Sequence, residues 1–451
     1  MKLLIATMVT IMIVLLVSCF NGGGLSFNSF VGNSGGSSGG TILGAFPKVF
    51  YGDSSYDIFY TIFPTSNGGI ILSGYHQGSG IDDALFVKIN SQGQTLWKKL
   101  GSIGTQSFSF FELNGYYYSA GTAYLGTQKN YITKLNPNGS TNTILYFDFL
   151  GYRGNLLPID NDSLIFLSNN EIAKIDTNLQ ASSSVKWVAE MNGNIITYNN
   201  LVVSAFPYHS EGNKYVFFIA QNSSGENKIC KMNVSSDSIT DFDSVSTVKK
   251  INGLPYLKSI CPGFNDDIII LGLDNSDKVL IAKADKDLNN INVQKLYNHN
   301  FDLENFNFRT GLILPGLGNK YLLVINGNSP DGSLVVLLNN DLTISRKVLL
   351  NMRVMSALPY GGGYVFAGKL NNTYDAVVMS LDSNLNPVGC NTVVNTSTPF
   401  TFEEDSGSPA VTLEDSTLNF VPDSISGLHN DNTATTDANL TEDTTCRTNW
   451  N

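Results

Sequence analysis

The side chains of this sequence best suited to covalent chemistry are its five thiols: Cys19, Cys230, Cys261, Cys390 and Cys446. A thiol can be acylated, joined in a disulfide or bound to a metal, and its neighbours in the chain indicate which. Cys19 follows Met1-Lys2 and an apolar run from Leu3 to Val17. A positive start and a short apolar stretch are typical of a signal peptide.

Cys19 ends the tetrapeptide Leu16-Val17-Ser18-Cys19, which resembles the lipobox of bacterial lipoproteins. In that family the thiol is acylated and the preceding bond is cut. The resemblance implies a signal peptide at residues 1–18 and a lipidated Cys19 that anchors the protein to the bacterial envelope, at the outer membrane or the cell surface. Two or more acyl chains anchor a protein stably. The alternative is an ordinary signal peptide or short anchor with a chance cysteine.

The other four cysteines form an even set, which in an exported chain indicates disulfides. Of the three possible connectivities we favour Cys230 with Cys261 and Cys390 with Cys446. The alternative for Cys230 and Cys261 is a pair of free, buried thiols.

The sequence contains no recognised arrangement of catalytic or metal-binding side chains. Its four histidines, His76, His209, His299 and His429, are far apart, and HExxH, CxxC, GxSxG and P-loop motifs are absent. The acidic runs at Asp274–Asp277 and Asp285–Asp287 lack the order of a calcium loop, so we expect structural turns there. We therefore expect no metal and no cofactor.

The formal charge of −11 is concentrated at one end of the chain. Residues 397–451 carry ten acidic residues and one basic residue, for a net −9, and the remainder is nearly neutral at −2. Nothing supplies the basic stripe that nucleic-acid binding requires. We expect residues 396–451 to form an acidic, mostly extended tail, with one strand added to a blade edge and its acidic half open in water.

A short motif, a proline before a Gly- or Asn-rich turn and an apolar run, repeats through most of the chain. Its prolines are Pro64, Pro158, Pro207, Pro262, Pro315 and Pro359, and a degenerate copy begins at Phe110. A Lys-apolar-Asn/Asp triplet, such as Lys88-Ile89-Asn90, keeps the same phase. The seven units are 44 to 55 residues apart, which indicates a repeat array or a propeller.

Each unit reads as four short strands with turns of Gly, Asn, Asp and Ser between them. The sequence therefore predicts an all-β protein: a seven-bladed β-propeller of four-stranded blades over residues 47–395, with an extended C-terminal tail. Residues 19–46, rich in Gly and Ser, read as a flexible tether. We expect Pro47–Tyr51 to pair beside Asp375–Asp382 and close the ring.

Three stretches of the first unit carry a family resemblance: Gly68–Gly74, Asp83–Asn90 and Gly93–Trp97. They resemble the bacterial β-propeller-repeat proteins, with a Gly-x-x-x-Trp end like that of quinoprotein-type propellers. That family is characterised by its fold, so the resemblance supports the fold and leaves the activity open. Aromatic runs at Phe108–Phe111 and Tyr116–Tyr118 we assign to the blade core, with a sugar-stacking surface as the alternative.

These observations favour a monomeric, non-enzymatic binding or scaffold module that holds a protein or a glycan on one propeller face. That face would gather the longer loops between second and third strands, at residues 76–82, 122–130, 221–227 and 326–332. The alternative is a propeller enzyme acting on envelope or extracellular polysaccharide, with carboxylates from different units meeting at the central channel.

Overall fold

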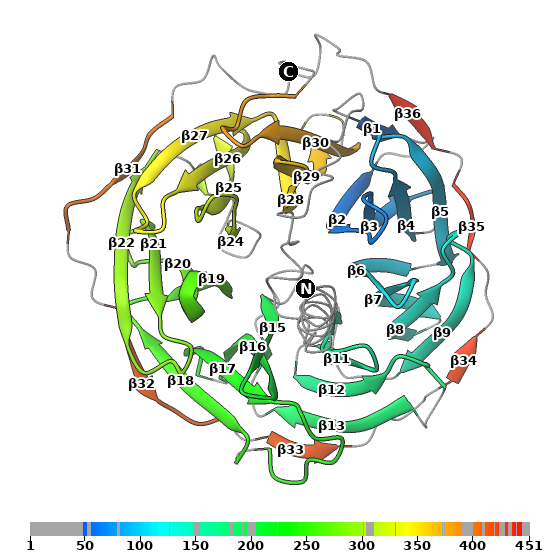
Figure 1. Cartoon of the computed structure of the whole chain (residues 1–451), viewed down its shortest axis with the longest axis horizontal. Coiled ribbons are helices and arrows are strands. Elements are labelled where there is room, and N and C mark those ends of the chain that lie inside the picture. Colours follow the sequence, from blue (N-terminus) through cyan, green and yellow to red (C-terminus); the bar gives the residue numbers. More distant parts are fainter. Residues whose placement is uncertain are drawn as a thin grey trace, which may run out of the picture.

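The computed structural model describes most of residues 48–443; residues 1–47, 52–55, 148–153, 196–203, 304–310, 389–399, 424–428 and 444–451, and gaps of one to three residues elsewhere, lie outside the description. Seven antiparallel sheets surround a central axis like the blades of a propeller (Figure 1). The prediction of an all-β, seven-bladed β-propeller is confirmed. Over these residues, no helix reaches the length and hydropathy needed to cross a bilayer.

Each blade starts beside the axis and adds strands outward. Blade 1 contains β2 (Asp57–Pro64), β3 (Ile70–Gln77), β4 (Asp82–Ile89) and β5 (Thr95–Ile103), and blade 2 contains β6 (Thr105–Leu113), β7 (Tyr116–Leu125), β8 (Thr127–Leu135) and β9 (Thr141–Phe147). Blade 3 contains β10 (Asn155–Pro158), β11 (Ser163–Leu167), β12 (Glu171–Asp176) and β13 (Val185–Met191). Blade 4 contains β14 (Asn194–Ile195), β15 (Ala205–Ser210), β16 (Asn213–Gln221), β17 (Asn227–Asn233) and β18 (Ser246–Asn252).

The remaining blades follow the same plan. Blade 5 contains β19 (Tyr256–Pro262), β20 (Ile268–Leu273), β21 (Val279–Ala284) and β22 (Ile291–His299). Blade 6 contains β23 (Asp302–Leu303), β24 (Leu312–Pro315), β25 (Tyr321–Ser329), β26 (Asp331–Leu338) and β27 (Ile344–Leu350). Blade 7 contains β28 (Met352–Tyr360), β29 (Gly363–Leu370), β30 (Ala376–Asp382) and, from the other end of the chain, β1 (Lys48–Tyr51).

The repeated proline ends the innermost strand in four blades, at Pro64, Pro158, Pro262 and Pro315. In blades 4 and 7 the strand continues past Pro207 and Pro359, which the sequence did not predict. An innermost strand has a neighbour on one side only, so a residue without an N–H is tolerated within it.

The glycine that ends the repeated apolar run lies opposite a bulge in the innermost strand. The register of β2 against β3 shifts between Phe59 and Thr61, beside Gly74. A Cβ on Gly74 would lie 1.8 Å from the Ile58 carbonyl oxygen, and Gly121 and Gly368 face the same obstruction in blades 2 and 7. Only glycine permits this close approach of two backbones.

In blades 1 to 5 the Lys-apolar-Asn/Asp triplet links the blade to the next one. Its Asn or Asp closes the turn after the third strand: Asn90 Oδ1, for example, accepts a hydrogen bond from the Gln94 N–H at 2.8 Å. Its lysine reaches the following blade, as where Lys134 Nζ donates to the Thr177 carbonyl oxygen at 3.3 Å. The triplet thus fixes both a turn and the spacing of two blades.

The N-terminal strand β1 closes the ring, as predicted. Lys48, Val49 and Phe50 pair with Val378, Val377 and Ala376 of β30. The hydrophobic core is divided into layers between adjacent blades, and Phe50, which is fully buried, belongs to the layer that joins blade 7 to blade 1.

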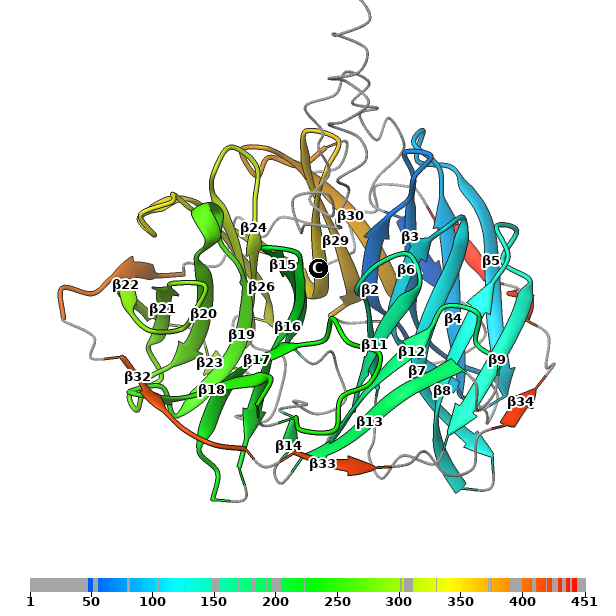
Figure 2. The ribbon, with the colours of Figure 1, turned by 60° about the horizontal axis from the view of Figure 1, so that its bottom comes forward.

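The described strands between Phe402 and Asp443 form a belt around the outside of the ring (Figures 1 and 2). We expected one added strand, but the described part of the tail contains six: β31 (Phe402–Glu404), β32 (Thr412–Asp415), β33 (Phe420–Asp423), β34 (His429–Asp431), β35 (Thr436–Asp437) and β36 (Thr441–Asp443). They pair with the outer strands of blades 5, 4, 3, 2, 1 and 7 in that order. The belt therefore runs against the order of the blades.

The belt is held by charge at a recurrent position of the ring. The outer strands of blades 1, 4, 5 and 7 each carry a lysine at the same register position. In blade 1, for example, Lys99 lies opposite Phe86, two residues before Lys88 of the triplet. The same offset from the triplet lysine or its counterpart applies in the other three blades. These lysines form ion pairs with belt carboxylates: Lys99 with Asp437 (2.5 Å), Lys249 with Asp415 (2.6 Å), Lys48 with Glu442 (2.5 Å) and Lys295 with Glu404. The expectation that like charges keep the acidic half open was wrong, because its strands pair with the outer strands of the ring and lysines of those strands bind some of its carboxylates.

Candidate binding site

A cavity of about 190 Å³ opens on the inner wall of the ring. Its walls come from β2, β6, β10 and β15, the innermost strands of blades 1 to 4. The lining is uncharged and mostly apolar: Thr61, Phe63, Phe108, Ser109, Phe110, Phe111, Asn155, Leu156, Leu157, Pro158, Ala205, Phe206 and Pro207.

The cavity lies beside two short innermost strands. β10 has four residues and β15 has six, whereas β2 has eight and β6 has nine. Two of the repeated prolines, Pro158 and Pro207, line the cavity on the two short strands.

The aromatic walls of the cavity are fixed by packing. Phe206 stacks on Phe217 with ring centroids 5.0 Å apart and planes 8° apart, and Phe111 stacks on Tyr118 at 5.8 Å. Phe108, Phe110 and Phe111 are almost fully buried, so the assignment of this aromatic run to the blade core is confirmed. The same residues also line the cavity, and its walls are therefore preformed.

Two polar atoms of the lining already accept a backbone hydrogen bond. The Leu156 N–H is shared between Asn155 Oδ1, at 2.8 Å, and Ser109 Oγ, at 3.2 Å. An apolar cavity of about 150 Å³ holds a benzene ring. The dimensions and chemistry here accordingly suit one uncharged apolar group, such as an aromatic ring or a branched aliphatic side chain.

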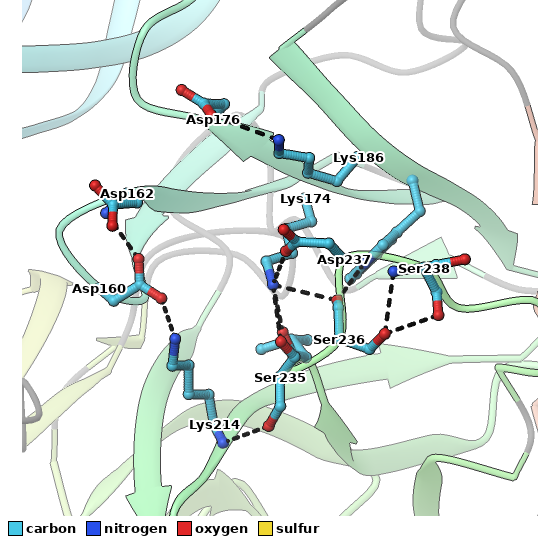
Figure 3. Close-up of polar contacts among 12 residues, drawn as sticks. Asp160, Asp162, Lys174, Asp176, Lys186, Lys214, Ser235, Ser236, Asp237 and Ser238 are labelled. Carbon is cyan, nitrogen blue, oxygen red and sulfur yellow. Dashed lines mark hydrogen bonds and ion pairs between the residues drawn. The ribbon is translucent and has the colours of Figure 1, made fainter.

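A network of polar contacts fixes blade 3 against blade 4 beside the cavity (Figure 3). Lys174 is 1% exposed and donates to the carbonyl oxygens of Val234 and Ser236 at 3.0 and 3.2 Å. Its Nζ is also 2.7 Å from the Asp237 carboxylate, and this hydrogen bond lowers the pKa of Asp237 although burial opposes it. Trp187 Nε1 donates to the same Ser236 oxygen at 3.1 Å.

The turn after β10 is tied to β16 by a second part of the network (Figure 3). Asp160 forms an ion pair with Lys214 and accepts a hydrogen bond from the Asp162 N–H at 2.8 Å. Burial alone would raise the pKa of Asp160, but the hydrogen bonds from Lys214 and Asp162 outweigh it and lower the pKa. Because these charges are matched, the network ties blade 3 to blade 4 rather than offering a reactive group.

The inner strands β2 and β6 carry two carboxylates that lie apart. Asp57, at the start of β2, is 2.5 Å from His76 Nδ1 on β3. Its hydrogen bond raises the pKa of His76, and burial opposes the shift. Glu112 lies near the other end of its strand, where it accepts a hydrogen bond from the Ser66 N–H at 3.0 Å. Counting outward from the Gly68-Gly69 turn would have placed Asp57 opposite Gln77. The bulge between Phe59 and Thr61 shifts the register by one residue and brings Asp57 opposite His76, so sequence reasoning missed this pair.

The other described histidines lie on different elements. His209 is on β15, where burial lowers its pKa, and the His299 ring is 2.6 Å from the Asp277 carbonyl oxygen. His429 is on β34, opposite Tyr146. Within the described ranges, no three His, Cys, Asp or Glu side chains gather as metal ligands would.

The two acidic runs form turns, as expected. Asp274 Oδ1 accepts hydrogen bonds from the N–H groups of Ser276 and Lys278 at 2.8 and 2.9 Å. Asp285 Oδ1 accepts one from Asn289 at 2.9 Å. Both carboxylates are therefore used to close the turns that follow them. Of the stretches expected to be longer loops, 122–130 and 326–332 are almost entirely strand, whereas a turn joins Asn222 to Glu226 between β16 and β17.

The predicted disulfide between Cys230 and Cys261 is wrong, because both are free and buried. Cys230 faces the core layer between blades 3 and 4, and Cys261 faces the layer between blades 5 and 6. Side chains on opposite sides of the intervening blades cannot meet. Burial raises the pKa of both thiols, which keeps them protonated. Cys19, Cys390 and Cys446 lie outside the described residues.

Comparisons with known proteins give structural likeness alone. No family model matches the chain, and no curated protein is similar to it in sequence. BamB from Moraxella catarrhalis is 12% identical with a TM-score of 0.43, over 73% of this chain and 97% of that one. The β-propeller domain of Cps50 (Swd1) from Myceliophteria thermophila is 9% identical with a TM-score of 0.45, over 74% and 99%. Puromycin hydrolase is 10% identical with a TM-score of 0.48, over 80% and 56%.

Proposed function

We propose that this protein is a non-enzymatic binding module of the bacterial envelope, tethered through an acylated Cys19, which holds a protein partner at the inner wall of its ring. The observation that carries the proposal is the uncharged cavity of about 190 Å³ with its preformed aromatic walls. Apolar pockets that receive one anchor side chain dominate many protein interfaces. A partner residue such as Phe, Leu or Trp would fill it.

The chemistry of the lining favours a protein over a glycan. A sugar needs several hydrogen-bonding partners, whereas the lining has few polar side chains, and the Ser109 and Asn155 oxygens each already accept a hydrogen bond from the Leu156 N–H. The alternative, cleavage of a polysaccharide, requires two carboxylates flanking one bond. Asp57 and Glu112 lie near opposite ends of their strands, and they contact His76 and Ser66.

Filling the cavity tests the binding function. Leu157→Trp should occupy it and remove the partner from material purified out of detergent-solubilised envelope. The matched control is Leu312→Trp, because Leu312 is also half-buried on a four-residue innermost strand but lies outside the cavity lining. Retention of the partner by both variants, or turnover of envelope polysaccharide by the purified protein, would contradict the proposal.

The anchor is tested separately. Cys19→Ala should abolish lipid labelling and release the protein from membranes, because the acyl chains are its proposed membrane contact. A variant that still sediments with membranes after a salt wash would show that the anchor is misassigned.

A further inference from the structure

The ring has one seam, between blade 7 and blade 1. Every other blade follows its neighbour along the chain, but here closure depends on β1, a strand of four residues, returning to β30. A short closing strand has few backbone hydrogen bonds to hold it, and its release would leave the edge of β30 unpaired. What holds β1 in place therefore determines whether the ring stays closed.

The end of the belt lies directly on this seam. β36 pairs with the free side of β1, so that Val49, Phe50 and Tyr51 face Asp443, Glu442 and Thr441. β1 is thus bonded along both edges, by β30 and by β36. The preceding belt strand β35 pairs with β5 of blade 1. The belt consequently bridges the two blades that the chain itself joins last.

Side chains reinforce this bridge. Ala438 and Leu440, between β35 and β36, are buried in the same core layer as Phe50. The Glu442 carboxylate is 2.5 Å from Lys48 Nζ, and Lys48 is only 4% exposed. Lys98 of blade 1 donates a hydrogen bond to the Leu440 carbonyl oxygen. Apolar, ionic and backbone contacts all converge on a segment of about six residues.

We propose that the belt segment 438–443 is a latch that locks the closure of the ring, so that β1 cannot leave its blade until the end of the tail has released it. The stability of β1, the first described strand, would then depend on the pairing of β36, the last one. The latch also bears directly on β1, the described strand that follows the proposed tether. Proteolysis or displacement of the tail end would then loosen the seam before any other part of the ring.

Hydrogen exchange of backbone amides in the full chain tests the latch. Leu440→Asp places a charge in the seam and should accelerate exchange of the Val49 and Phe50 amides by about tenfold or more, while β12 and β20 are unaffected. The control is Phe420→Asp, because Phe420 is buried in the belt on blade 3, away from the seam. It should leave the β1 amides unchanged.

A milder variant covers the case in which Leu440→Asp does not fold. Glu442→Gln removes only the ion pair with Lys48 and should accelerate the same β1 amides by about two- to threefold. Unchanged β1 exchange in the folded variants would overturn the proposal. So would equal acceleration of β1 by Phe420→Asp, since the belt would then act as one unit rather than as a latch at its end.

Discussion

The inner wall and the outer rim of the ring are built from the same repeated unit, but the rim is covered by other residues of the chain and the inner wall has an open cavity. On the rim, lysines at a recurrent register bind the carboxylates of the belt, and Phe402, Val411, Leu418, Phe420, Ala438 and Leu440 of the belt are buried. On the inner wall, a cavity bordered by aromatic rings lies beside short strands. The rim is occupied by the protein's own tail, whereas the inner wall keeps an open, mostly apolar cavity.

Removing the belt should have the largest effect, because the rim would then be as uncovered as the inner wall. Ending the chain after residue 399 removes the six buried apolar side chains of the belt and uncovers the outer strand edges of the ring. At about 1.5 to 3 kcal/mol for each large side chain, we expect a loss on the order of 5 kcal/mol or more, with aggregation through the exposed edges. Denaturant unfolding and light scattering measure both. Unfolding at the same denaturant concentration as the full chain would show that the belt contributes little to the ring.

A single belt anchor should have the next largest effect. Phe402 is 1% exposed and stacks on Tyr297 with ring centroids 4.9 Å apart. Phe402→Ala should lower the free energy of unfolding by about 3 to 5 kcal/mol, through lost burial and the space left behind. Thr401→Ala, at the exposed neighbouring position, is the control and should change it little.

Enlarging a side chain on the inner wall should be tolerated, in contrast to the belt. Ala205 lines the cavity, so Ala205→Leu has room and should change the free energy of unfolding by less than about 1 kcal/mol. Ala220→Leu is the matched comparison within blade 4, because Ala220 is fully buried in the core layer. Overpacking there should cost about 1 to 3 kcal/mol. Equal costs at both positions would argue that the cavity is closed in solution.

The smallest effect is the pH dependence of stability that comes from the pair of Asp57 and His76 in blade 1. Because the hydrogen bond to Asp57 raises the pKa of His76, protonated His76 stabilises the folded state. This contribution is fully present below the unfolded value of about 6.5 and is lost as pH rises through the higher folded value. NMR titration should place the pKa of His76 above 6.5, and Asp57→Asn should bring it down. A titration at or below 6.5 in the parent protein would contradict this assignment.

Most of the fold was predictable because its determinants are local. The phase of the prolines, the glycines and the Lys-apolar-Asn/Asp triplets predicted seven units, since each marks a turn, a bulge or a blade contact that recurs in most units. The closing strand at Pro47–Tyr51 was predictable for the same reason, as the seventh unit lacked a fourth strand. The aromatic run Phe108–Phe111 pointed to the core, but not to the cavity that lies beside the short strands of blades 3 and 4.

The belt and the cysteines were decided only by the tertiary structure. Strands as short as Thr436–Asp437 have no recognisable periodicity, and their position depends on exposed edges and lysines more than 300 residues earlier in the chain. Likewise, the alternation of side chains along β17 and β19 sends Cys230 and Cys261 into different core layers, which spacing alone does not reveal. Local sequence sets turns and strands, whereas contacts between distant segments form only when the closed ring presents its edges.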